Sequence, residues 1–270
     1  MTKIEFDART HPGKVRGHNE DNIFASAENH LWIVADGMGG HACGEVASEI
    51  VVREISRQVP NGQDLVTAIE LSHTAVTDEA SANTDAKGMG ATVVALQLQG
   101  KHYQIAWVGD SRCYRLRKNK LELLTRDHSY LEWLKDNGIA VEEARQHPKR
   151  NVITQSIGVG EPNPDIVSGE HSAGDRYLLC SDGLNDELTD EEIATILHCA
   201  DNAESVTAKL VAAALECGGR DNISVIVLDI DPANRSKRWS SAHQQLKKWL
   251  PVLCGVLAAV ATVMMLKLFT

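Results

Sequence analysis

The sequence predicts an α+β protein: a four-layer α-β-β-α sandwich of two antiparallel sheets flanked by helix pairs, plus a C-terminal transmembrane helix. Segments with helical periodicity follow one another in pairs, and segments with strand periodicity come in runs. This order is typical of antiparallel sheets with helices outside rather than of alternating parallel units. The transmembrane helix is predicted from a long apolar stretch near residue 270.

Two helices are predicted in the first third of the chain. From Gly44 to Val59 the apolar residues recur at helical spacing and the opposite face is polar, with the apolar positions at Val46, Ile50, Val51, Ile55 and Val59. Pro60-Asn61-Gly62 ends this helix, and a second helix is expected from about Gln63 to Ala80.

The middle of the chain changes to an apolar period of two, which is typical of strands. Strands separated by short polar turns are expected at Ala91–Gln99, Tyr103–Gly109, Cys113–Arg117 and Leu121–Leu124. Residues 127–165 then form a long insertion with one helix at Tyr130–Asn137, the kind of segment that covers a functional site.

Strands and helices return after the insertion. Strands are expected at Arg176–Cys180 and Ile223–Ile230, and helices from a capping box at Thr189 to about Cys199 and over Ala203–Cys217. We therefore divide the chain into a folded domain at 1–231, a polar basic linker at 232–248 and a membrane anchor at 249–268.

The predicted anchor depends on the composition of the last segment. From Trp249 to Leu266 there is no charged residue, and a helix of this length is about 27 Å long, close to the hydrocarbon thickness of about 30 Å. Lys247 and Lys248 precede it, so the positive-inside rule places the domain in the cytoplasm. The alternative is a buried amphipathic helix, which would need a polar face.

Charge and cysteine usage limit the function classes. The formal net charge is -10, from 37 acidic and 27 basic residues, which argues against a nucleic-acid binder because such proteins need a basic face. The six cysteines include no C-x-x-C pair and indicate neither a zinc site nor a disulfide framework. The N-terminal residues resemble no signal peptide, so a reducing cytosol is the expected compartment of the domain.

The first candidate functional residue is Asp36, which follows the apolar run Trp32-Ile33-Val34-Ala35 and precedes Gly37. Alone, an aspartate-glycine turn after a strand is usually only a turn. Aspartates flank further apolar strands in the same way, however, and an N-terminal loop adds two more carboxylates: Asp110, Asp182, Asp221, Glu20 and Asp21.

Carboxylates brought together would repel one another unless cations lay between them. Oxygen-only ligands favour Mg²⁺ or Mn²⁺ over zinc. Two such ions about 3.5–4 Å apart can clamp a phosphate for in-line attack by a bridging hydroxide. Arg16 is the nearest candidate for a bidentate grip on that phosphate, although an ordinary surface arginine would fit the spacing as well.

At this point a family resemblance emerges, carried by motifs that follow one another over residues 9–230. The motifs are Arg16-x-x-x-Glu20-Asp21-Asn22, Val34-Ala35-Asp36-Gly37-Met38-Gly39-Gly40, Gly88-Met89-Gly90-Ala91-Thr92, Val108-Gly109-Asp110-Ser111-Arg112, Leu124-Thr125-x-Asp127-His128-Ser129, Ser181-Asp182-Gly183-Leu184-x-Asp186 and Arg220-Asp221-Asn222-Ile223-Ser224. Together they resemble the metal-dependent protein serine/threonine phosphatases of the 2C type, in particular the bacterial branch.

The resemblance implies a central β-sandwich and hydrolysis of phosphoserine and phosphothreonine in proteins, with two Mn²⁺ or Mg²⁺ ions as the cofactor. It implies that Asp36 bridges both metals and that Gly37 ligates one of them through its carbonyl. Asp182 and Asp221 would complete the shell of the other metal.

The remaining matched positions have supporting roles in the family pattern. Glu20 and Asp21 would hold metal-bound water, and Asp110 and Asp186 match the aspartates of a third metal. Arg16 matches the phosphate-binding arginine, and residues 127–165 would be the flap beside the active site.

One position departs from the family pattern. Many eukaryotic members carry a histidine two residues after the bridging aspartate, proposed as the general acid for the leaving alkoxide. Here that position is Met38, which has no proton to donate. His41 is the candidate for the acid role, but it could equally cap the following helix or face solvent.

The predicted function is therefore phosphoprotein hydrolysis that reverses serine/threonine kinase signalling at the membrane. The expected partners are phosphorylated proteins, with a membrane serine/threonine kinase and its substrates among them, and the membrane itself through the C-terminal helix; no nucleic acid is expected. The expected location is the inner (cytoplasmic) membrane, and bacterial secretion systems are one setting. The alternative is a non-catalytic metal-binding docking module with the same fold. A calcium-binding adhesion domain explains the aspartates and glycines but not the cytosolic cysteines.

Overall fold

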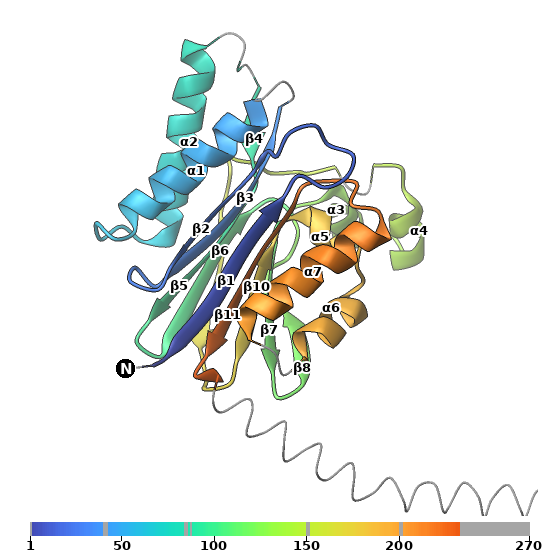
Figure 1. Cartoon of the computed structure of the whole chain (residues 1–270). Coiled ribbons are helices and arrows are strands. Elements are labelled where there is room, and N and C mark those ends of the chain that lie inside the picture. Colours follow the sequence, from blue (N-terminus) through green and yellow to red (C-terminus); the bar gives the residue numbers. More distant parts are fainter. Residues whose placement is uncertain are drawn as a thin grey trace, which may run out of the picture.

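Two antiparallel sheets lie face to face, and helices cover both outer faces (Figure 1). We describe residues 2–39, 43–83, 86, 88–149, 152–199 and 202–232 from a computed structural model of the chain. The arrangement is an α-β-β-α sandwich, so this part of the predicted fold class fits the structure.

One sheet is covered by the C-terminal helices. Its strand order is β1-β11-β10-β7-β8, with β1 at Ile4–His11, β11 at Ile223–Ile230, β10 at Arg176–Cys180, β7 at Arg112–Arg117 and β8 at Lys120–Leu123. The helices beside it are the short α5 at Asp182–Asn185, α6 at Asp190–Leu197 and α7 at Ala203–Cys217 (Figure 1). The predicted capping box of Thr189 and Glu192 opens α6.

The other sheet is covered by the N-terminal helix pair, α1 at Cys43–Gln58 and α2 at Leu65–Ala82 (Figure 1). Its strand order is β2-β3-β5-β6-β9, with β2 at Asp21–Ser26, β3 at Leu31–Met38, β5 at Val93–Gln99, β6 at His102–Val108 and β9 at Asp165–Glu170. The two-residue strand β4, Gly90–Ala91, pairs with the end of β3.

Strand β3 shows why its sequence is apolar without interruption. Its side chains alternate between two cores: Leu31, Ile33 and Ala35 pack under α1 and α2, whereas Trp32 and Val34 pack between the sheets. Since a helix layer covers one face and the second sheet covers the other, Leu31–Ala35 are buried, and Asp36 near the end of the strand is half-buried. The core therefore fixes the position of Asp36.

Several elements were not predicted, among them β1, β4, β9, α5 and α4 at Val141–Gln146. Strands β1 and β9 lie at sheet edges, where polar residues alternate with apolar ones only weakly. Helix α4 follows α3 at Tyr130–Asp136 inside the insertion. The helix predicted at the start of the insertion is confirmed, and the insertion is less irregular than expected.

The predicted fold class needs one correction. In the part of the chain that the structure describes, no helix is long and apolar enough to cross a membrane, so for these residues the predicted fold class is corrected to the sandwich alone. The longest described helix, α2, has 18 residues and carries the charged residues Glu70, Asp78 and Glu79. The predicted linker beyond residue 232 and the anchor at 249–268 lie outside the described residues, and the domain boundaries stay predictions.

Candidate functional site

Two of the predicted site residues lie opposite each other in one sheet. The antiparallel register of β2 and β3 pairs Asp21, the first residue of β2, with Asp36 near the end of β3. Two hydrogen bonds join Asp36 to Thr92. The Asp36 N–H donates to Thr92 Oγ1 at 3.3 Å, and the Thr92 N–H donates to the Asp36 carbonyl at 2.8 Å. Both carboxylates thus occupy one end of the sandwich.

The second sheet brings its aspartates to the same end. Asp182 follows the last residue of β10, and Asp221 precedes the first residue of its antiparallel neighbour β11. A hydroxyl joins the sheets, since Ser181 Oγ donates to Asp21 Oδ2 at 2.8 Å. Asp110 lies in the turn between β6 and β7, which belong to different sheets.

Burial and mutual repulsion change the acidity of this group. The pKa of Asp21 is raised to about 7, chiefly by burial and also by the charges of Asp182 and Asp221, while hydrogen bonds from Ser224 and Ser181 lower it. Burial also raises the pKa of Asp182 to about 6, helped by the charges of Asp186 and Asp221.

The other two carboxylates are perturbed more strongly. Burial raises the pKa of Asp36 well above its usual range, and the charges of Asp21, Asp182 and Asp110 add to the shift. Burial likewise raises the pKa of Asp110. A hydrogen bond between the carboxyl groups of Asp36 and Asp182 raises the former pKa and lowers the latter. Such a group of like charges stays together only with protons or cations among them.

Unpartnered oxygens test whether cations fit here. Oδ1 of Asp21, Oδ1 of Asp110 and Oδ1 of Asp182 are buried and have no hydrogen-bond donor within the described residues. Buried acceptors without a donor are rare and unfavourable. Among the described residues no three acidic, histidine or cysteine side chains are grouped so that they could hold a metal ion as they stand, so the carboxylates lie near one another without forming such a group. Their oxygen-only chemistry and orphaned atoms fit divalent cations of the Mg²⁺ and Mn²⁺ type.

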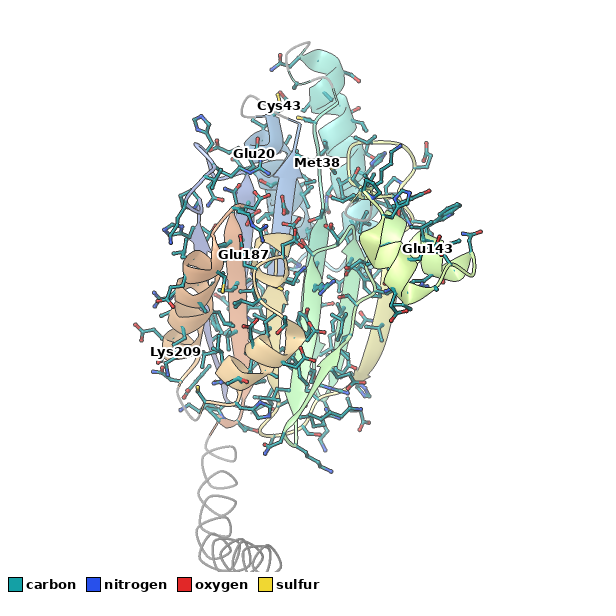
Figure 2. The ribbon with its side chains drawn as sticks, turned by 90° about the vertical axis from the view of Figure 1, so that its right-hand side faces the viewer. Glu20, Met38, Cys43, Glu143, Glu187 and Lys209 are labelled. Atoms are coloured by element: carbon teal, nitrogen blue, oxygen red, sulfur yellow. The ribbon has the colours of Figure 1, made fainter. Side chains whose placement is uncertain are left out.

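Gly37 is a glycine because the backbone is crowded around it. A Cβ added there would lie 2.0 Å from the carbonyl oxygen of Gly44 and 2.6 Å from that of Glu20. The Gly37 N–H donates to the Glu20 carbonyl at 3.1 Å, and Ser48 Oγ donates to it at 2.6 Å. Figure 2 shows Glu20 and Met38 at the same end of the sandwich. The predicted ligands Glu20 and Gly37 are therefore neighbours.

Arg16 lies at the edge of the carboxylate group. Its Nη2 donates to Asp221 Oδ2 at 2.7 Å, and its side chain is 54% exposed. Because this guanidinium is exposed, it can leave Asp221 and turn toward an incoming anion. Arg16 is also the only arginine or lysine among the predicted site residues.

The two remaining predicted residues differ in outcome. Asp186 is exposed, but its charge raises the pKa of both Asp182 and Asp110, and its backbone N–H donates to the Asp182 carbonyl at 2.8 Å. It therefore belongs to the group. His41 lies outside the described residues, so its acid role stays a prediction.

Sequence reasoning missed the hydroxyl and amide groups that hold the carboxylates. Ser181 Oγ contacts Asp21 and also receives the N–H of Ser224 at 3.0 Å. Asn222 receives the N–H of Glu20 at 2.8 Å. Each stands beside a predicted aspartate in a quoted motif, and that adjacency was the available signal.

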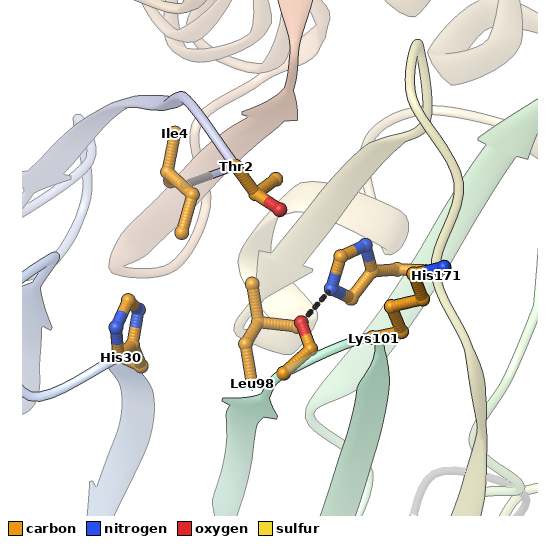
Figure 3. A pocket seen from close by; sticks show the side chains of 7 residues that line it. Thr2, Ile4, His30, Leu98, Lys101 and His171 are labelled. Atoms are coloured by element: carbon orange, nitrogen blue, oxygen red, sulfur yellow. Dashed lines mark hydrogen bonds between the residues drawn. The ribbon is translucent and has the colours of Figure 1, made fainter.

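The opposite end of the sandwich carries a pocket of different character (Figure 3). Its volume is about 450 Å³, and it is lined by Thr2, Ile4, His30, Leu98, Gly100, Lys101 and His171. The ring of His171 contacts the Gly100 carbonyl at 2.9 Å, shown by the dashed line. None of the predicted site residues lines this pocket, so cavity size alone does not locate the candidate site.

A buried group of aspartates between two sheets, beside an exposed arginine, is a divalent-cation site suited to an anionic substrate. Residues 14–218 match the family model described as Protein phosphatase 2C, and the chain belongs to the protein phosphatase 2C family. The predicted family and the predicted enzyme class, a protein serine/threonine phosphatase, are confirmed at this level.

Curated relatives carry matching names. The serine/threonine protein phosphatase PstP of Mycobacterium tuberculosis is 39% identical over 234 residues, which are 84% of this chain and 45% of the relative. The chain thus spans less than half the length of that relative. The serine/threonine phosphatase stp of Listeria welshimeri is 36% identical over 236 residues, 82% of this chain and 94% of the relative.

Solved structures agree with the fold. The Mycobacterium tuberculosis phosphatase PstP/Ppp superposes with a TM-score of 0.80 at 37% identity, covering 86% of this chain and 100% of that one. PppA of Pseudomonas aeruginosa gives 0.76 at 36% identity, over 84% and 97% of the chains. The PstP catalytic domain in complex with two manganese ions gives 0.74 at 33% identity, over 85% and 99%. The predicted cofactor agrees with the contents of that relative.

Proposed function

We propose that this chain hydrolyses phosphoserine and phosphothreonine in proteins with two Mn²⁺ or Mg²⁺ ions held at the carboxylate end of the sandwich. The observation that carries the proposal is the meeting of aspartates from both sheets, buried together with raised pKa values and unpartnered oxygens. Groups perturbed in this way by burial and like charges are typical of functional sites.

Each ligand has a place in the fold. Asp36 is the central carboxylate because the charges of Asp21, Asp110 and Asp182 all act on it, so it is the residue suited to bridge two ions. The carbonyl of Gly37 would complete one ion's ligands, and Asp182 and Asp221 the other's. Asp110 and Asp186 would serve a third ion, and Glu20 and Asp21 would hold metal-bound water.

Bound ions would supply positive charge against the phosphoryl oxygens and water of lowered pKa. The chain's own residues bind and orient the substrate. Arg16 offers parallel N–H donors that match two phosphate oxygens, and its exposed position lets it exchange Asp221 for the phosphate. The buried strands β3 and β10 keep the carboxylates in place, so the site is ordered before substrate binds.

Proton donation to the leaving serine or threonine oxygen needs an acid, and His41 is the proposed one. A His41→Ala enzyme should hydrolyse phosphopeptides more slowly than the wild type, and the deficit should shrink with p-nitrophenyl phosphate, whose leaving group needs no proton. Unchanged turnover on phosphopeptide would remove His41 from this role.

The test of the proposed function uses Asp36→Asn, which keeps the size of the side chain and removes its charge. The wild type should release phosphate from phosphopeptides with Mn²⁺ or Mg²⁺, and the variant should not, while its circular dichroism stays native. A wild type inert toward phosphopeptides and p-nitrophenyl phosphate with both ions would favour the alternative, a docking module.

The biological role we propose is reversal of serine/threonine kinase signalling, with phosphoproteins and a membrane kinase as partners. The name of the Pseudomonas aeruginosa relative PppA, a key regulatory component of T6SS, supports a secretion-system setting. Phosphoproteomics of a strain carrying Asp36→Asn would identify the substrates by their accumulation. The predicted location at the cytoplasmic membrane stays a prediction, which cell fractionation checks.

A further inference from the structure

The loop between β1 and β2 carries two predicted site residues, Arg16 and Glu20, and has little apolar anchoring. Val15, the apolar side chain in its centre, is 70% exposed, and Arg16, Gly17 and His18 are exposed as well. A loop of this kind holds its shape only through polar contacts. The question is which side chain supplies them.

Asn222 supplies three of these contacts from one side chain that is only 4% exposed. Its Nδ2 donates to the carbonyl of Pro12 at 3.0 Å and to the carbonyl of His18 at 2.9 Å, while its Oδ1 accepts the N–H of Glu20 at 2.8 Å. Both amide hydrogens and the amide oxygen are therefore spent on the backbone of one loop. The three contacts span the loop from its first residues to its last.

Residues 219–222 contact the loop at further points. Lys14 N–H donates to the Gly219 carbonyl at 2.7 Å, and a Cβ added to Gly13 would lie 2.2 Å from the Asp221 carbonyl oxygen. Oδ1 of Asp221 accepts the backbone N–H of Asn222 at 2.9 Å, and Oδ2 of Asp221 accepts from Arg16 at 2.7 Å. Loop 12–20 thus lies directly on residues 219–222.

We propose that Asn222 is a positioning residue for the phosphatase reaction, whose side chain holds loop 12–20 so that Arg16 and Glu20 stand beside Asp221. This inference rests on the proposed function of the site. The side chain of Asn222 bonds backbone atoms of Pro12, His18 and Glu20, and it acts through the loop backbone. It fixes the phosphate-binding arginine relative to the metal ligands before substrate binds.

Asparagine is the side chain that this place requires. Aspartate has the same shape and keeps the acceptor for the Glu20 N–H, but it would set a negative oxygen against the carbonyls of Pro12 and His18. Alanine removes all three contacts. Comparing Asn222→Asp with Asn222→Ala therefore separates the two donated bonds from the accepted one.

Kinetics on a phosphoserine peptide at saturating Mn²⁺ give the first arm of the test. Both variants should lower kcat/KM by about 100-fold, the loss expected when a catalytic group is misplaced by about 1 Å. Asn61→Ala is the matched control, because it removes a single exposed hydrogen bond from the Asn61 side-chain amide to the Arg57 carbonyl at the end of α1. It should change kcat/KM by less than about 2-fold. An Asn222→Asp enzyme within about 2-fold of the wild type would overturn the proposal.

A double-mutant cycle with Arg16→Ala separates positioning from general damage. If Asn222 acts through Arg16, the loss caused by Arg16→Ala should be at least about 5-fold smaller in the Asn222→Ala background than in the wild type. Equal losses in both backgrounds would mean that Asn222 serves only the stability of the fold, and would contradict the inference.

Hydrogen exchange gives a readout independent of catalysis. In Asn222→Asp the amides of loop 12–20, above all that of Glu20, should exchange at least about 10-fold faster, while the amides of β10 remain protected. Unchanged protection of the loop would contradict the tether even in an enzyme without activity. An inactive wild type would contradict the proposed function, and this arm would still decide whether Asn222 holds the loop.

Discussion

Two groups of buried charges lie in the same sandwich and behave in opposite ways. Arg176 and Asp229 form an ion pair between β10 and β11 whose side chains are 0% and 1% exposed, with bonds of 2.7 and 2.9 Å. The third guanidinium nitrogen donates to the Leu197 carbonyl at 2.8 Å, at the end of α6. The aspartates at the sheet ends are buried or half-buried, but they carry like charges and leave oxygens without donors.

The difference distinguishes a charged group that stabilises the fold from one that serves the function. The Arg176 group is completed by the chain itself, so it ties the outer helix layer to the sheet and needs nothing from outside. The aspartate group is incomplete. Its raised pKa values result from burial and from the repulsion of neighbouring negative charges. Only a ligand of positive charge completes it. The first group should therefore control stability and the second activity.

The largest effect is expected at the incomplete group. Asp182→Asn removes a predicted metal ligand, so kcat/KM for phosphopeptide hydrolysis should fall on the order of 10³-fold. Because the change also removes a repelling charge, the melting temperature of the metal-free protein should stay equal or rise. Steady-state kinetics and a thermal scan on the same preparation measure kcat/KM and the melting temperature. A large drop in melting temperature would contradict the distinction between the two groups.

The complete group should show the reverse. Asp229→Ala leaves Arg176 buried without its partner, so unfolding free energy should fall by about 3–5 kcal/mol. Activity per folded molecule should remain close to that of the wild type. Urea unfolding measures the first quantity and active-site titration the second. Replacing both partners by Met and Leu should recover most of the stability, whereas no recovery would argue against a self-contained pair.

Ions should stabilise the protein through the incomplete group alone. Binding of Mn²⁺ at 100 times its Kd adds about 2.7 kcal/mol of stability, which is about 5–10 °C in melting temperature for a domain of this size. A chelator should remove the gain. Asp36→Asn should show little of it, while Asp229→Asn should keep the full increment from a lower starting point.

The smallest effect concerns two cysteine thiols, Cys180 at the end of β10 and Cys217 at the end of α7. Burial raises the pKa of Cys180 to about 12, so this thiol stays protonated at pH 8 and reacts only when the protein opens. Exposed Cys217 should react with a thiol reagent at once. Asp229→Ala should accelerate labelling of Cys180, and Asp182→Asn should not. Equal rates of Cys180 labelling in the two variants would count against the distinction.

The sequence was sufficient for elements whose pattern reflects a single environment. The apolar runs of β3 and β10 predicted strands, and the spacing in α1 and α7 predicted helices close to their observed bounds. Edge strands β1 and β9 escaped because all of their residues are exposed or half-buried, so no buried apolar run marks them. A strand is easiest to predict where its surroundings are most uniform.

The site was predictable in its members but not in its arrangement. Asp36 and Asp182 stand out because the same pattern, an apolar run followed by an aspartate, recurs along the chain. The contact of Ser181 with Asp21 and the grip of Asn222 on Glu20 join segments about 160 and 200 residues apart, which only the register of two sheets brings together. No local pattern in the chain encodes that register.

Calorimetric titration of the metal-free protein with Mn²⁺ tests the central claim most directly. The account predicts that the wild type binds two ions tightly and that Asp36→Asn, with an unchanged fold, loses this binding because the bridging carboxylate acts on both. Binding of two ions by Asp36→Asn with wild-type affinity, or an absence of Mn²⁺ binding by the folded wild type, would contradict it.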